Sequence, residues 1–101
     1  MKQTNKQAVG TSFHSTTVNA TVTDLKTILG SPLFSDNDGE DKVNFEWHME
    51  TDTGDVFTVY DWKEYRSIDA DEPIEWHIGG MSKHITDQAK KEIETALQFV
   101  N

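Results

Sequence analysis

The chain of 101 residues contains no cysteine, only two prolines and a single arginine. Without cysteine, disulfide bonds, thiolate metal sites and cysteine nucleophiles are excluded, and a reducing compartment is the natural setting. No apolar run approaches the roughly 18 residues that a membrane-spanning helix needs. The stretch from Met1 to Gln7 is too polar for the core of a secretory signal. We therefore expect a cytoplasmic protein with no membrane partner.

Positive charge is scarce, because 9 lysines and arginines face 18 acids, for a formal net charge of −9. Proteins bind duplex DNA through Lys and Arg that neutralise phosphates, so we expect no direct DNA binding. Residues 36–55 hold eight of the acids and only one base, Lys42. Such a stretch either keeps a small protein soluble or steers it onto a basic enzyme surface, as a mimic of DNA does. Both interpretations remain open.

Hydrophobic periodicity predicts one α+β domain over residues 12–101, preceded by a flexible tail over residues 1–11. The order β-α-β-β-β-α is typical of a mostly antiparallel sheet, here of about four strands, with two helices packed on one side. We expect Thr23 to cap the first helix, and Gly79 with Gly80 to end the last strand. The expected strands are Ser12 to Ala20, Val43 to Glu50, Val56 to Trp62 and Ile74 to Ile78, and the expected helices are Thr23 to Leu29 and Ser82 to Val100.

The side chains with the most varied chemistry lie in two short stretches, Tyr60 to Arg66 and Glu75 to Gly80. Aromatic rings stack on planar bases, Lys and Arg bind phosphate, and a glycine pair lets backbone amides approach an anion. If the strands that end at Trp62 and begin at Ile74 are neighbours, both stretches meet at one end of the sheet. The candidate ligand-binding residues are Tyr60, Trp62, Lys63, Tyr65, Arg66, Trp76, His77, Gly79 and Gly80.

In this hypothesis Trp62 and Trp76 stack on the ligand, which is a nucleotide-like anion. Lys63 and Arg66 supply positive charge, and His77 donates a hydrogen bond. The competing interpretation is structural. It places the aromatic residues in the core and pairs the two cations with the acids of the loop that follows them.

Motifs for catalysis and metal binding are weak. The acidic stretch from Asp36 to Asp41 lacks the glycine at position 6 and the glutamate at position 12 of a calcium loop. No G-x-S-x-G motif is present. We therefore expect no catalytic residue, metal or cofactor. A metal-dependent hydrolase that uses three histidines and Asp61 is the remaining enzymatic alternative. The histidines, none with metal-ligand spacing, are His14, His48, His77 and His84.

The strings Phe57 to Lys63 (FTVYDWK) and Glu75 to Gly80 (EWHIGG) resemble a small bacteriophage protein family of unassigned activity. The similarity covers about residues 43–90. By analogy, phage accessory proteins of this size counter a host defence, either by sequestering cyclic nucleotide signals or by blocking a defence enzyme. The resemblance implies a non-enzymatic protein of the host-cell cytoplasm, whose partner is a nucleotide-like small molecule or a host defence protein. The modest apolar content is also compatible with a homo-oligomer, in which copies of the chain cover each other's exposed strand edges.

Overall fold

The computed structural model describes residues 1–100. Its strands form one antiparallel sheet in the order β1-β4-β5-β6-β2, with β3 also paired to β4. In chain order the elements are β1 (Lys2–Gln3), β2 (Ser12–Ala20), α1 (Val22–Leu29), β3 (Phe34–Ser35), β4 (Phe45–Glu50), β5 (Val56–Tyr60), β6 (Ile74–Gly80) and α2 (Lys83–Leu97). The α+β class and the two helices are confirmed, but the sheet has six strands rather than about four. The extra strands, β1 and β3, have two residues each, too few to show a periodicity.

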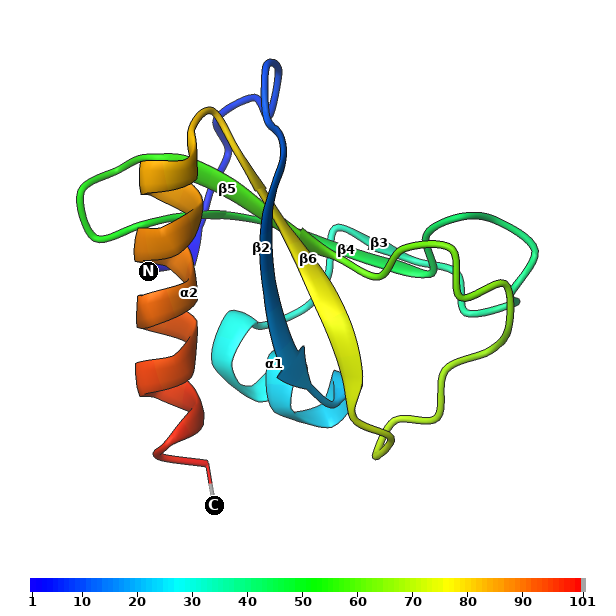
Figure 1. Cartoon of the computed structure of the whole chain (residues 1–101). Coiled ribbons are helices and arrows are strands. Elements are labelled where there is room, and N and C mark those ends of the chain that lie inside the picture. Colours follow the sequence, from blue (N-terminus) through cyan, green and yellow to red (C-terminus); the bar gives the residue numbers. More distant parts are fainter. Residues whose placement is uncertain (101) are drawn as a thin grey trace.

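Both helices cover one face of the sheet (Figure 1). Trp47 of β4 and Trp76 of β6 are fully buried on that face, and their rings meet edge to face at 5.6 Å. Their indole N–H groups donate to the carbonyls of Gly30 and Ala20 at 2.8 and 2.9 Å. The core lies mainly between the sheet and the helices, and Ile68 of the connection between β5 and β6 is also buried in it. Within residues 1–100, neither helix is long and apolar enough to cross a bilayer.

Helix α1 begins earlier than we expected, because Thr21 and not Thr23 is its N-cap. The backbone of Thr21 is extended, and its side chain accepts a hydrogen bond from the Asp24 N–H at 3.0 Å. The hydroxyl of Thr23 donates instead to the Ala70 carbonyl at 3.0 Å. Gly30 ends the helix with a φ of 85°, as its sequence position predicted.

Gly79 and Gly80 lie within β6, so the expectation that they end this strand was wrong. Gly79 pairs with Thr58 of β5, and a Cβ on Gly79 would lie 2.5 Å from the Thr58 hydroxyl oxygen. A Cβ on Gly80 would lie 2.9 Å from the Thr86 methyl group of α2. These glycines are required by close packing on the two faces of the sheet, and not by a reversal of the chain.

The first residues, predicted to be a flexible tail, contact the rest of the domain. Lys2–Gln3 pairs with β4, and the Gln3 side chain donates to the Leu29 carbonyl at 3.0 Å. The amino group of Met1 contacts Asp52 and Glu92. The segment after β1 then leads from the β4 edge of the sheet to β2 at the opposite edge.

Because Trp76 is buried and Trp62 is not, replacing each by Phe should change the free energy of unfolding differently. Trp76→Phe should lower the free energy of unfolding by about 1–3 kcal/mol, because it leaves space in the core and removes the donor to the Ala20 carbonyl. Trp62→Phe, at a position that is 40% exposed, should change it by less than about 0.5 kcal/mol. Urea denaturation of both variants measures the difference. Equal losses would contradict the placement of Trp76.

Candidate functional site

The face of the sheet opposite the helices, called here the open face, carries a group of aromatic rings. Phe13 of β2 stacks on His77 of β6, with ring centroids 4.1 Å apart and an interplanar angle of 17°. Trp62, which follows β5, stacks on His77 at 6.3 Å. Tyr60 of β5 contacts His77 and Trp62 edge-on, at 5.5 and 6.1 Å. Phe13 and Trp62 remain 42% and 40% exposed, so both rings are accessible to a ligand.

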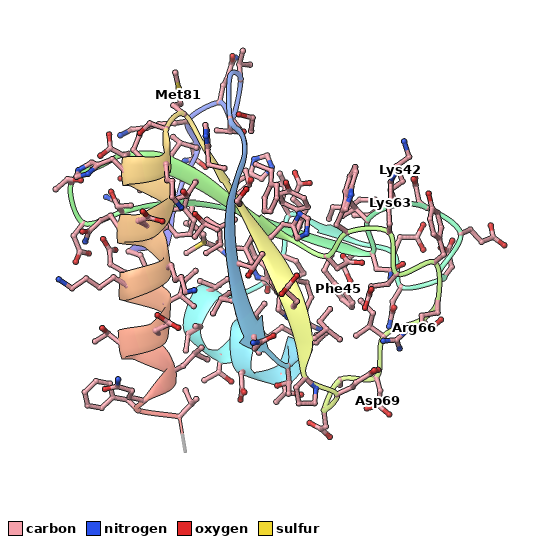
Figure 2. All side chains as sticks on the ribbon, in the orientation of Figure 1. Lys42, Phe45, Lys63, Arg66, Asp69 and Met81 are labelled. Atoms are coloured by element: carbon pink, nitrogen blue, oxygen red, sulfur yellow. The ribbon has the colours of Figure 1, made fainter. Side chains whose placement is uncertain are left out.

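Two lysines flank the exposed indole of Trp62. The Nζ atoms of Lys63 and Lys42 lie 5.6 and 6.0 Å from its ring centroid. The Lys63 N–H donates to the Lys42 carbonyl at 2.8 Å, and Figure 2 shows both side chains at the end of the sheet away from α2. Lys63 has a φ of 55°, in the left-handed region that a residue with a side chain adopts only at an energetic cost. An anion placed beside this indole would meet both ammonium groups.

A buried carboxylate holds the two lysine-bearing segments together. Asp61, immediately before Trp62, is fully buried, and its oxygens accept the N–H groups of Asn44 and Phe45 at 2.8 Å each. The Asn44 side chain donates in turn to the Arg66 carbonyl at 2.9 Å. Burial raises the pKa of Asp61, and the hydrogen bonds from these N–H groups oppose that shift. Asp61 is therefore a positioning residue for the end of the site that contains Trp62.

A hollow of about 340 Å³ opens on the same face, within the size range of small-molecule pockets. Tyr60, Trp62 and Gly79 line it together with two polar residues of β4, Glu46 and His48, whose side chains contact each other. Gly79 also lines the hollow, where the Thr58 hydroxyl packs so closely that no Cβ would fit. Burial, and then the charge of Glu46, raise the pKa of Tyr60, so its hydroxyl is a proton donor at neutral pH.

A larger hollow, of about 490 Å³, lies on the helical side and is lined by Met1, Ile28 and residues of α2. No aromatic ring lines it. The amino group of Met1 already contacts two acids of the lining, Asp52 and Glu92. The open face is therefore the stronger candidate, because it combines aromatic rings, two lysines beside an exposed indole and a hollow.

Of the residues that the sequence singled out, Tyr60, Trp62, Lys63, His77 and Gly79 do gather on the open face. These five come from two neighbouring strands and the loop that follows one of them. Their convergence confirms that the strand before Lys63 and the strand that begins at Ile74 pair with each other.

Trp76 and Gly80 do not belong to this group. Trp76 is fully buried in the core, which leaves it no free face for stacking on a ligand. Gly80 packs against α2. The physical reason is strand geometry, since successive residues point to opposite faces, so Trp76 and His77 cannot face the same ligand.

Arg66 and Tyr65 lie on the connection between β5 and β6, and Arg66 is already paired. Both terminal nitrogens of Arg66 bind the Glu72 carboxylate at 2.7 Å, as the structural interpretation of the sequence proposed. This contact lowers the pKa of Glu72 and raises that of Arg66. Tyr65 is 54% exposed, with a φ of 51°. Neither residue lines the hollow.

Sequence reasoning missed four members of the site: Phe13, Lys42, Glu46 and His48. Alternation along β4 does place Glu46 and His48 opposite the apolar residues, so a signal for them was present. Phe13 depends on the pairing of β2 with β6, between residues 66 positions apart. No local pattern reveals such a pairing.

The histidines do not support the hydrolase alternative. Within residues 1–100, no three side chains of His, Asp or Glu gather as metal ligands would. Asp61 lies on the core side, whereas His48 and His77 lie on the open face. His14 instead places its Nε2 3.0 Å from the Gly80 carbonyl oxygen.

Comparisons of the chain with protein-family models, with curated proteins and with solved structures returned no match. Function is therefore inferred from the chemistry and geometry of the open face.

The ring of His77 should titrate below the ordinary histidine range of about 6.5, because burial disfavours its charged form and lowers its pKa. The unfolded chain then takes up this proton at a higher pH than the folded chain, so stability should fall as the pH drops below about 6.5. Phe13→Ala exposes the ring and should raise its pKa towards the ordinary value. Proton NMR of the His77 ring against pH measures the pKa in the wild type and in Phe13→Ala. An identical titration in the two proteins would contradict the stacking of Phe13 on His77.

Removal of the buried carboxylate should disturb the site as well as the fold. Asp61→Ala leaves the N–H groups of Asn44 and Phe45 without acceptors, at a cost of about 1–3 kcal/mol for each buried group. We expect a lower denaturation midpoint together with a shift of the Trp62 indole signal in the ¹⁵N NMR spectrum. Asp69→Ala, on the exposed connection, is the control and should change neither. An unshifted Trp62 signal in Asp61→Ala would show that the carboxylate does not position this residue.

Proposed function

We propose that this protein is a non-catalytic binding protein that captures a nucleotide-like anionic ligand on the open face of its sheet. The observation that carries the proposal is the exposed indole of Trp62 with the ammonium groups of Lys63 and Lys42 5.6 and 6.0 Å from its ring centroid. An exposed indole offers a stacking surface to a base, and ammonium groups bind phosphate. The adjacent hollow supplies space for a small ligand.

The biological role follows from the resemblance to a bacteriophage protein family. Capture of a cyclic nucleotide signal would remove it from a host defence system, and this requires affinity without turnover. The open face fits that role because its rings and cations can hold a ligand. The hollow is open to solvent, so a second copy of the chain placed over it would enclose the ligand further.

The alternative role, an acidic inhibitor that occludes a defence enzyme, is less well supported by the distribution of charge. Six of the eight acids of residues 36–55 lie in the two loops at the ends of β4, on opposite sides of Figure 1, and the other two, Glu46 and Glu50, lie within β4 itself. Glu50 contacts Lys2 at 3.5 Å, and Asp52 contacts the amino terminus. A mimic of DNA needs unpaired acids along one continuous surface.

Isothermal titration calorimetry with mononucleotides and with cyclic di- and trinucleotides tests the proposal. Trp62→Ala should weaken binding by about 5- to 150-fold, which corresponds to the loss of about 1–3 kcal/mol for one stacked base. The double variant Lys42→Gln, Lys63→Gln should also bind more weakly, because it removes both cations beside the indole. Lys83→Gln on α2, which removes a positive charge away from the open face, is the control and should bind as the wild type does.

Two outcomes would replace the proposal. If no nucleotide gives heat while one host protein co-purifies, the inhibitor role takes its place, and charge reversal of the acids at 36, 38, 40 and 41 should then abolish inhibition. If the nucleotide is converted to a product and a chelator stops the conversion, the protein is a metal-dependent hydrolase. Recovery of the ligand unchanged supports capture.

A further inference from the structure

The charged groups around the hollow on the open face differ in sign from one end to the other. Lys42 and Lys63 do not line the hollow but lie beside Trp62, which does, whereas Glu46 lies in the lining with His48 beside it. A phosphate group is attracted to the lysines and repelled by the carboxylate. A bound nucleotide is therefore oriented, with its phosphate towards Lys42 and Lys63 and its base towards Glu46.

The dimensions agree with a single nucleotide. Glu46 is four residues from Lys42, which places their backbones at most about 14 Å apart. Glu46 is the direct strand partner of Tyr60, whose ring meets that of Trp62 at 6.1 Å. A base that contacts the Glu46 carboxylate therefore also lies beside the Tyr60 ring, on the side of Glu46 that faces the indole.

The carboxylate of Glu46 has an oxygen available to a ligand. Its Oε2 contacts Nε2 of His48, while within residues 1–100 no protein hydrogen bond to Oε1 is found. The side chain is 33% exposed, enough to be reached from the hollow. An ionised carboxylate only accepts hydrogen bonds, so it selects a base edge that presents donors.

Among the common bases, guanine meets this requirement best. Its Watson–Crick edge presents two adjacent donors, the N1–H and the 2-amino group. Adenine and cytosine place a ring nitrogen acceptor beside their single amino group, and this acceptor would be repelled by a carboxylate. Uracil has one N–H between two carbonyl acceptors. A site that binds through a charged acceptor discriminates strongly against an edge with the wrong pattern.

We propose that the hollow is a guanine-specific subsite, in which Glu46 accepts hydrogen bonds from guanine while Lys42 and Lys63 bind the phosphate of the same nucleotide. This inference rests on the proposed function and names its ligand class, a guanine nucleotide, either free or as one half of a cyclic dinucleotide. Glu46 is then a specificity-determining residue, and Trp62 supplies affinity for any base.

The test compares GMP, IMP and AMP, because IMP lacks only the 2-amino group of GMP. Binding is followed by calorimetry and by the Trp62 indole signal in the ¹⁵N NMR spectrum, identified by its absence from Trp62→Phe. The other two tryptophans, Trp47 and Trp76, are buried and serve as internal references. We expect GMP to bind at least about tenfold more tightly than IMP and AMP, the effect of losing one charge-assisted hydrogen bond.

Glu46→Gln should remove this preference, so that GMP, IMP and AMP bind with similar affinity, since Gln presents a donor as well as an acceptor. Glu75→Gln is the matched control, because Glu75 is an exposed acid on the same face of β6 and does not line the hollow. It should retain the preference for GMP. An unchanged melting temperature in both variants shows that the fold is preserved.

The possible failures are distinguishable. If all three nucleotides shift the Trp62 signal with equal affinity, or if the preference survives in Glu46→Gln, guanine specificity is wrong and the nucleotide-binding proposal stands. If no nucleotide shifts the Trp62 signal at millimolar concentration, the proposed function itself is wrong and the subsite is withdrawn with it.

Discussion

The end of the sheet that bears the site depends on the buried carboxylate of Asp61. This residue continues the core-facing series of Phe57 and Val59, yet it carries a charge that must be compensated inside the protein. The N–H groups of Asn44 and Phe45 provide that compensation. A buried carboxylate without donors costs several kcal/mol, so the segment before β4 has to stay beside the segment after β5. This constraint brings Lys42 and Lys63 to the same indole.

The division of the sheet into a packed face and an open face explains why neighbouring residues have unrelated roles. Trp76 packs in the core, whereas His77 holds the rings of Phe13 and Trp62 on the other side. The same rule separates Gly80, which packs closely against α2, from Gly79, which packs closely against Thr58 beside the hollow. Because the helices cover only one side, rings that would elsewhere be core remain accessible to a ligand.

Charge on this molecule favours recognition by contact over long-range attraction. The net charge of −9 repels a phosphate at a distance, and the two lysines at the site are screened beyond about 8 Å at physiological salt. In the proposed function, an anionic ligand is therefore held by close contacts, namely stacking, two ammonium groups and hydrogen bonds. The restriction of the cations to one end of the hollow, with Glu46 in its lining, also gives such a ligand one orientation.

The sequence by itself determined the α+β class, the two helices and the main strands, because periodicity reports which side of an element is buried. It also indicated that residues of the β5 and β6 segments belong together. Only the tertiary structure decided which of them share a face: the register excludes Trp76 and admits Phe13, and a salt bridge to Glu72 occupies Arg66. The strands β1 and β3 and the pairing of Lys42 with Lys63 arise from contacts between distant segments. Local patterns carry no information on such contacts, because their energy exists only once the chain has folded.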